Sequence, residues 1–184
     1  MSEQVPDFIK ARVSDEMFDM VSRVDKVIEK RNSTYHGIKM YLNPQKRSMS
    51  YIHMNALGID ISSHGMVFVA SLQANYSGNK RTYKSFANSC KRLRIESKAI
   101  SENKESLIDR IFTSIISASD YTEWEYHIIR MVEFLAKEEI DIDYCELIAD
   151  YYDWKQKNVS EKWAMEYWKF EKKDKDKGEE NVSE

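Results

Sequence analysis

The sequence predicts an all-α protein, and two observations carry this prediction. The 184 residues include only 5 Gly and 2 Pro, whereas all-β proteins need turns rich in both at short intervals. Apolar residues make up 42% of the chain and charged residues 32%, which is typical of a globular protein with a strongly charged surface. The length is sufficient for one well-buried core or two small helical lobes.

The first helix is expected to begin after Ser14 and to end near Arg31. Ser14 is a candidate N-cap, and Asp15 and Glu16 suit the positive end of the helix dipole. Apolar residues then recur at helical spacing. Pro44 ends the shorter helix that follows, because proline cannot continue a helix.

A further helix is expected around residues 51–61, and the one after it should be the most deeply buried. The run 65–72 is apolar on nearly every side, as in a core helix. Periodicity alone also fits a strand, but no second strand pattern lies nearby to pair with it. After a polar loop, Thr82 is a candidate N-cap for a helix whose apolar positions are Tyr83, Phe86, Cys90 and Leu93.

The C-terminal half predicts a compact antiparallel bundle. Residues 107–116 carry an apolar helical stripe, and Thr122 with Glu125 forms a capping box for the next helix. Asp143 is a candidate cap for a third helix, and Ser160 begins the last one. Four tryptophans at helical spacing are interpreted as core or subunit-contact residues, namely Trp124, Trp154, Trp163 and Trp168.

Charge is distributed unevenly along the chain. The net charge is −3, yet residues 78–98 hold seven basic residues and one acidic residue. A basic segment embedded in an acidic protein indicates a nucleic-acid contact along one face, although such runs often do no more than solvate a helix. Lys84, Lys91, Arg94 and Lys98 follow at steps of seven, three and four, which predicts one stripe along a helix.

The candidate nucleic-acid-binding residues follow from this segment. A stripe of Lys and Arg neutralises phosphates, and Asn79, Ser85 and Asn88 supply neutral donors. The first-choice candidates are Lys80, Arg81, Lys84, Lys91, Arg92, Arg94 and Lys98. Lys46 and Arg47, after the Pro44 turn, come second.

Motifs for catalysis or cofactor binding are absent from the sequence. No phosphate-binding loop, dinucleotide fingerprint or nucleophile elbow is present, so no catalytic residue, metal or cofactor is predicted. Asp143 is explained as a helix cap and Asp150 as a solvent-facing residue. The histidines never pair at ligand spacing and are interpreted as surface or half-buried residues, namely His36, His53, His64 and His127.

Two features indicate a cytoplasmic location. The N-terminus lacks the apolar run of a secretory signal, and no stretch approaches the roughly 20 apolar residues needed to span a bilayer. Cys90 and Cys145 are far apart without metal or redox spacing, so they are interpreted as reduced core residues.

The C-terminal half resembles the small-subunit (CasB-type) family of type I-E CRISPR Cascade complexes. The resemblance rests on three consecutive elements in matching order and spacing. They are the Asp109–Phe112 segment with Ile115–Ala118, the run from Ile140 to Trp154 that ends its helix in tryptophan, and the closing segment Lys162–Trp168. The match covers about residues 35–170, and its diagnostic part is about 107–168.

The resemblance implies a two-lobed all-α protein that acts without catalysis. We expect a flexible N-terminus at 1–13, an N-terminal lobe at 14–103 with the basic segment 78–98, a C-terminal bundle at 104–170 and a disordered tail at 171–184. The family would place the chain in two copies beside other Cascade subunits and crRNA. There it would contact the target and displaced DNA strands and stabilise the R-loop.

Two other readings stay open from the residues alone. The chain fits a helical protein-interaction adaptor that does not bind nucleic acid, with exposed aromatic side chains docking a partner. An enzyme whose site is assembled only in space is the third reading. The chain also departs from the family in two ways. Residues 85–90 lack the glycine that members usually carry in the helix after the variable loop, and the C-terminal half is acidic.

Overall fold

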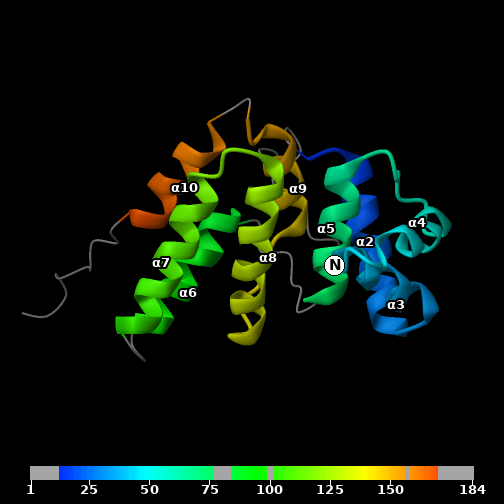
Figure 1. Ribbon diagram of the computed structural model, residues 1–184, viewed down its shortest axis with the longest axis horizontal. Coiled ribbons are helices and arrows are strands. Elements are labelled where there is room, and N and C mark those ends of the chain that lie inside the picture. The colour runs from blue at the N-terminus through cyan, green and yellow to red at the C-terminus, as the bar shows by residue number, and fades with distance from the viewer. Residues whose placement is uncertain (1–12, 77–83, 99–101, 156–157, 170–184) are drawn as a thin grey trace, which may run out of the picture.

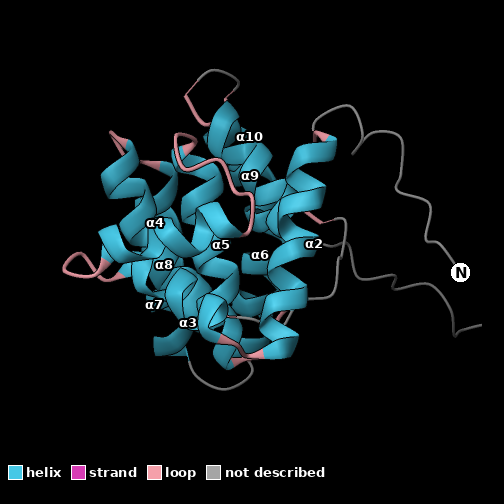
Figure 2. Ribbon diagram, turned by 90° about the vertical axis from the view of Figure 1, so that its right-hand side faces the viewer, coloured by secondary structure: helices cyan, strands magenta, loops and turns pink. Residues whose placement is uncertain are grey.

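The computed structural model describes residues 13–76, 84–98, 102–155 and 158–169. Within these ranges the chain forms nine α-helices and one short 3-10 helix, and no strand (Figure 2). The predicted all-α class is therefore confirmed. Figure 1 shows an elongated arrangement with α6, α7 and α10 towards one end, α2, α3 and α4 towards the other, and α8 and α9 between them. The expected tail and most of the expected flexible N-terminus lie outside the described residues.

Three α-helices and one short 3-10 helix form the first part of the N-terminal region. They are α2 (Asp15–Lys30), α3 (Ser33–Lys39), the 3-10 helix η1 (Met40–Leu42) and α4 (Arg47–Ala56). Ser14 caps α2 as predicted, because its hydroxyl accepts the N–H of Met17 at 3.3 Å. Helix α4 ends earlier than the expected 51–61 helix. Gly58, at φ 71°, adopts the left-handed conformation that terminates it.

Helix α5 (His64–Asn75) lies at the centre of the N-terminal region. Every residue from Gly65 to Ala74 is buried, which confirms a core helix in place of a strand. It packs against α2, α3 and α9. A Cβ at Gly65 would lie 2.6 Å from Tyr151 Cδ1, so glycine permits the close approach of α9.

Four helices form the C-terminal group. They are α6 (Phe86–Lys98), α7 (Glu102–Ile116), α8 (Tyr121–Lys137) and α10 (Val159–Trp168). Helix α6 packs against α7, α8 and α10 through the fully buried Phe86, Cys90 and Leu93. The predicted cap Thr82 lies outside the described residues, and Ser85 Oγ accepts the N–H of Asn88 at 3.3 Å at the start of the helix.

The predicted capping box of α8 is wrong by two residues. Asp120 is the N-cap and accepts the N–H of Glu123 at 2.9 Å, while the Glu123 carboxylate accepts the N–H of Ser119 at 2.8 Å. This reciprocal pair satisfies the N–H of Glu123 in the first turn and that of Ser119 just before the N-cap, so Thr122 is not needed as a cap. Glu125 is thereby available for contacts outside the helix.

Helix α9 (Tyr144–Asp153) lies between the N-terminal helices and the C-terminal group (Figure 1). Asp143 caps it as predicted, accepting N–H groups from Cys145 and Glu146 at 3.1 and 3.2 Å. It packs against α5 and α2, and its Tyr151 and Asp150 also bond to α8 and α10, because α9 has buried residues on more than one face. Helix α6, expected with the N-terminal lobe, packs against the C-terminal helices. The division into lobes at residue 103 stays a prediction.

Three of the four tryptophans form a buried cluster that links α8, α9 and α10. The ring centroid of Trp124 lies 5.2 Å from that of Trp154 and 6.0 Å from that of Trp163, and the latter two are 5.7 Å apart. Phe86 adds α6 to the cluster at 5.2 Å from Trp163. All three are buried as predicted, whereas Trp168 is 38% exposed.

Candidate nucleic-acid interface

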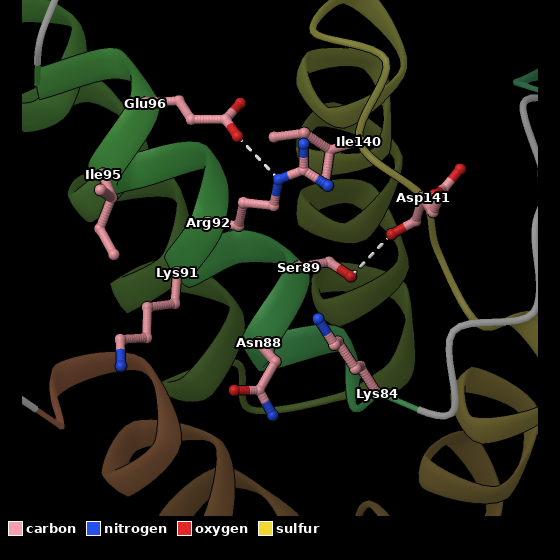
Figure 3. Close-up of a pocket in the computed structure, with 9 residues that line it drawn as sticks. All are labelled: Lys84, Asn88, Ser89, Lys91, Arg92, Ile95, Glu96, Ile140 and Asp141. Atoms are coloured by element: carbon pink, nitrogen blue, oxygen red, sulfur yellow. Dashed lines mark hydrogen bonds and ion pairs between the residues drawn. The ribbon is translucent and has the colours of Figure 1, made fainter. Parts of the chain in front are cut away.

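A cleft that gathers basic side chains runs along α6. It has a volume of about 450 Å³ and lies between α6 and the loop that joins α8 to α9 (Figure 3). We call this cleft the α6 groove. Three cations, two carboxylates, two uncharged polar side chains and two isoleucines line it, namely Lys84, Asn88, Ser89, Lys91, Arg92, Ile95, Glu96, Ile140 and Asp141.

Three of the predicted basic residues line this groove. The Lys84 amine points towards its middle and the Arg92 guanidinium towards Ile140, whereas Lys91 points to the opposite flank of the helix (Figure 3). Arg92 Nε donates to Glu96 Oε1 at 2.7 Å, one turn later on the same helix. These two side chains are 56% and 43% exposed. Water therefore screens the pair, and the arginine remains accessible to a ligand.

Hydrogen bonds fix the walls of the groove. Ser89 Oγ donates to the carbonyl of Asp141 at 2.8 Å and so ties α6 to the α8–α9 loop. Asn88 Nδ2 donates to Ser85 Oγ at 3.0 Å, and the Ser85 hydroxyl also contacts the Glu166 carboxylate of α10. The basic side chains therefore project from a backbone that is held at several points, so less ordering is required when a ligand binds.

Arg94 has a different environment from the other basic residues of α6. Its Nε donates to Asp109 Oδ1 of α7 at 2.9 Å, and its guanidinium lies 5.6 Å from the ring centroid of Tyr167 on α10. The Tyr167 hydroxyl donates to the same carboxylate oxygen at 2.6 Å. Burial, and then this hydrogen bond, raise the pKa of Tyr167 well above its usual value. We call these three residues the α6 clamp.

The predicted stripe is therefore divided between two environments. The step of three from Lys91 to Arg94 falls about 60° short of a full turn. This rotation brings Arg94 towards the buried row that contains Cys90 and Leu93. An ion pair with α7 becomes possible there. Whether Arg94 also touches nucleic acid stays a prediction.

The second-choice candidates lie on the N-terminal side of the molecule. Lys46 is exposed in the turn before α4. Arg47 Nε donates to the carbonyl of Tyr41 at 3.2 Å, and its guanidinium lies 4.7 Å from the centre of the Tyr41 ring. Arg47 is thus held against its own half of the chain, at a distance from the α6 groove.

Three further predicted basic residues lie outside the α6 groove or outside the described residues, and two groove residues were not predicted. Lys80 and Arg81 lie outside the described residues, and Lys98 is the last residue of α6. Sequence reasoning missed Ile140 and Asp141, which form the far wall of the groove. No pattern near the basic segment pointed to them, because a loop some forty residues later in the chain supplies that wall.

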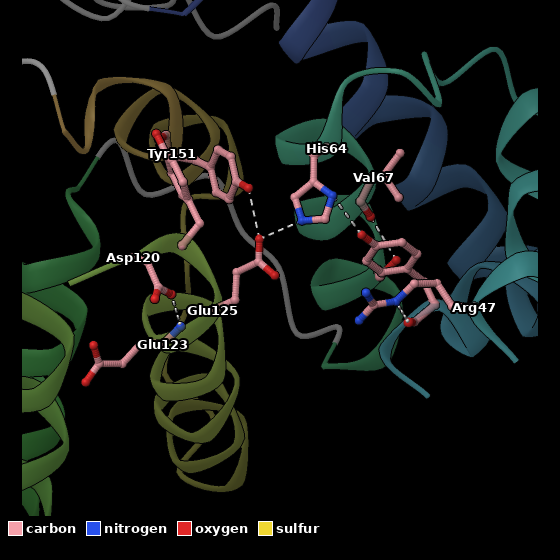
Figure 4. A network of polar contacts seen from close by, with 10 residues as sticks. Arg47, His64, Val67, Asp120, Glu123, Glu125 and Tyr151 are labelled. Carbon is pink, nitrogen blue, oxygen red and sulfur yellow. Dashed lines mark hydrogen bonds and ion pairs between the residues drawn. The ribbon is translucent and has the colours of Figure 1, made fainter. Parts of the chain in front are cut away.

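A second polar network connects α5 with α8 and α9 (Figure 4). The Tyr41 hydroxyl and His64 Nδ1 lie 3.2 Å apart, and His64 Nε2 lies 2.8 Å from Glu125 Oε1. Tyr151 donates its hydroxyl to the same oxygen at 2.9 Å. Burial raises the pKa of Tyr41 to about 12, so this hydroxyl stays protonated near neutral pH. Glu125 thus performs an inter-helix function that the predicted capping box had obscured.

The opposite end of α5 has a similar tie. The Tyr76 hydroxyl, at the end of α5, donates to Glu133 Oε1 of α8 at 2.8 Å. Glu125 and Glu133 are eight residues apart on α8, so both lie on the same side of that helix. Hydrogen bonds therefore join α5 and α8 near both ends of α5.

Other predicted features are also placed by the structure. The four histidines are exposed or half-buried, as predicted, and both cysteines are buried thiols. Asp150 is fully buried, contrary to the solvent-facing prediction, because it accepts the indole N–H of Trp163 at 3.0 Å. Among the described residues, no three His, Cys, Asp or Glu side chains group closely enough to hold a metal ion. None of the described helices combines the length and apolar character required to cross a membrane.

Comparison with known proteins gives one match. The model of the family described as CRISPR-associated protein Cse2 matches residues 13–168, which is most of the chain. Searches of curated proteins and of solved structures give no match. The matched range includes α6, the groove, the clamp and the tryptophan cluster.

Proposed function

The chain belongs to the family of CRISPR-associated protein Cse2, the small subunit of type I-E Cascade complexes, and we propose that it holds nucleic acid in such a complex. In this proposal it is a non-catalytic, cytoplasmic subunit present in two copies beside crRNA and the other Cascade subunits. It contacts the target and displaced DNA strands and stabilises the R-loop.

The observation that carries the proposal is the α6 groove. Its cations project from a helix that is fixed to α7, α8 and α10. Exchange between a DNA duplex and an RNA–DNA hybrid is close to balanced, so a few phosphate contacts suffice to shift it. Such contacts require Lys and Arg on a stable frame and no catalytic group. The proposed surface is centred on Lys84, Lys91 and Arg92, and the other candidate residues extend it.

The test reverses the charge of two groove residues that make no contact essential to the core. We expect Lys84→Glu with Arg92→Glu to weaken single-strand binding by about tenfold or more at low salt. Two lost contacts should also flatten the slope of log affinity against log salt by about 1.4. Fluorescence anisotropy of a labelled oligonucleotide over a salt series measures both quantities.

A matched control separates the groove from overall charge. Lys26→Glu with Lys30→Glu makes the same change in net charge at exposed positions of α2. This control should bind almost as well as the wild type, and circular dichroism should show unchanged helicity in both variants. Equal losses in the two double variants would mean that the α6 groove is not the contact surface.

A specific observation favours the adaptor as the second candidate. Met49 and Ile52 lie one turn apart on α4 and are 56% and 73% exposed. Exposed apolar side chains that cluster in this way are typical of protein-interaction surfaces. If the chain is such an adaptor, its affinity for the partner protein should change little with salt. Ile52→Ser should lose this binding, and the Lys84→Glu, Arg92→Glu variant should retain it.

A further inference from the structure

The α6 groove is not lined by hydrogen-bond donors alone. Beside its cations it carries the carboxylate of Glu96 and the aliphatic side chains of Ile95 and Ile140. A site for the phosphate backbone requires only donors, and a carboxylate repels phosphate. The mixed lining therefore fits a ligand with an apolar surface and a polar edge better than it fits phosphate alone.

Arg92 and Glu96 present a donor and an acceptor side by side. Their hydrogen bond of 2.7 Å joins exposed side chains, and the Arg92 guanidinium points towards Ile140, which lines the same groove (Figure 3). An arginine has five N–H donors and a carboxylate about four acceptor positions, so both groups keep capacity for a ligand. The Watson–Crick edge of every nucleobase carries an adjacent donor and acceptor, and its ring face is apolar.

We propose that the α6 groove receives one unstacked base of a single strand. The base edge meets Arg92 and Glu96, its face lies against Ile140, and Lys84 contacts a neighbouring phosphate. The groove volume of about 450 Å³ is within the range of pockets for small organic ligands. This inference rests on the proposed function and specifies its ligand as an unpaired nucleotide.

Two properties follow from this arrangement. Every base can satisfy a donor–acceptor pair, so the groove tolerates any sequence, which a complex guided by RNA requires. A base in a duplex has its Watson–Crick edge occupied, so the groove selects unpaired strands. Among the described residues that line the groove none is aromatic, so these residues offer a base that has left its stack no ring to stack on.

The test uses the full-length chain and a single-stranded oligonucleotide with one 2-aminopurine between adenines. This base is quenched while stacked and brightens when unstacked. Anisotropy of a terminal dye reports binding in the same sample. We expect binding to be accompanied by a severalfold rise in 2-aminopurine emission. Because the groove accepts any base, the matched probe is an oligonucleotide of the same length that is abasic throughout, and it should bind several times more weakly.

The variant Glu96→Ala separates base insertion from backbone binding by the sign of its effect. If phosphate alone occupies the groove, removing this carboxylate tightens binding, because a repulsive charge is lost and Arg92 is released. With a base in the groove, the variant loses the base contact, so the 2-aminopurine signal falls by half or more and binding does not tighten. Glu29→Ala, an exposed carboxylate on α2, is the control for net charge.

The two proposals fail in different ways. No anisotropy change for the wild type at low salt overturns the proposed function and this inference together. Normal binding with unchanged 2-aminopurine emission, together with tighter binding by Glu96→Ala, overturns only the proposal that a base enters the α6 groove.

Discussion

Arg92 and Arg94 are two residues apart on α6, and each pairs with a carboxylate. Arg92 pairs with Glu96 of its own helix on the groove side, where the two side chains are 56% and 43% exposed. Arg94 pairs with Asp109 of α7, where the exposed fractions are 27% and 32%, and Tyr167 of α10 shares that carboxylate. One helix thus presents an accessible arginine on one side and a structural arginine on the other.

The difference shows that position around the helix determines what a basic residue does. Two residues along a helix correspond to about 200° of rotation. On the solvent side, water competes for the charges and the pair contributes little to stability. Between helices, Arg94 and the shared Asp109 carboxylate are less exposed to water. The hydrogen bonds of this carboxylate therefore stabilise the packing of α6 against α7 and α10.

The largest expected effect comes from removing the centre of the clamp. Asp109→Ala leaves both Arg94 and Tyr167 without their shared acceptor. We expect the free energy of unfolding to fall by about 2–3 kcal/mol, the usual contribution of hydrogen bonds to a charged group. Urea denaturation followed by circular dichroism measures it. A loss no larger than that of Glu96→Ala would remove the distinction between clamp and groove.

Removing the Tyr167 hydroxyl of the α6 clamp should lower stability more than removing the buried Tyr144 hydroxyl. Tyr167→Phe removes the 2.6 Å bond to Asp109, and we expect a loss of about 1.5 kcal/mol. Tyr144 provides a matched control, because its hydroxyl is buried and has no hydrogen-bond partner among the described residues. Tyr144→Phe should be neutral or stabilising. Thermal unfolding of the two variants measures the two changes in stability. Equal losses of stability would contradict the role given to Tyr167.

Alkaline pH should act on the clamp and leave the groove pair unchanged. Burial and the Asp109 hydrogen bond raise the pKa of Tyr167, so above about pH 10 the unfolded chain releases this proton before the folded chain does. The stabilisation from Tyr167 is therefore complete below pH 10 and is lost as pH rises beyond it. Tyr167→Phe lacks this loss, so the difference in unfolding free energy between it and the wild type should narrow from pH 8 to pH 11.

The smallest effect on stability is expected at the groove pair. Arg92→Ala should change the free energy of unfolding by at most about 0.5 kcal/mol, because exposed pairs at this helical spacing contribute only tenths. The same variant should weaken oligonucleotide binding severalfold. Chemical denaturation and anisotropy on one preparation test both statements. A large loss of stability without a loss of binding would reverse the assignment of the two arginines.

Local features of the fold were predictable from the sequence. Ser14 and Asp143 act as caps because a side chain and the N–H groups two or three residues later are close in any helix. Helix α5 was predictable because apolar residues on every side allow only a buried position. The capping box of α8 was misplaced because Asp120 and Glu123 form the same pattern two residues earlier, and only tertiary contacts explain why Glu125 faces His64.

The candidate site was only partly predictable. The basic segment identified Lys84, Lys91 and Arg92, because charge is a property of the sequence. The wall formed by Ile140 and Asp141 was not predictable, since it depends on where the α8–α9 loop lies. The role of Arg94 depends in turn on the positions of α7 and α10.

The position of α9 has a consequence for how the chain folds during synthesis. Helices α2 to α5 leave the ribosome early, but the surface of α5 around Gly65 is covered only when Tyr151 of α9 has been made. Until then this apolar helix lacks its partner. The N-terminal helices should therefore reach their final packing only late in translation, and a nascent chain halted before residue 144 is the form most exposed to aggregation and proteolysis.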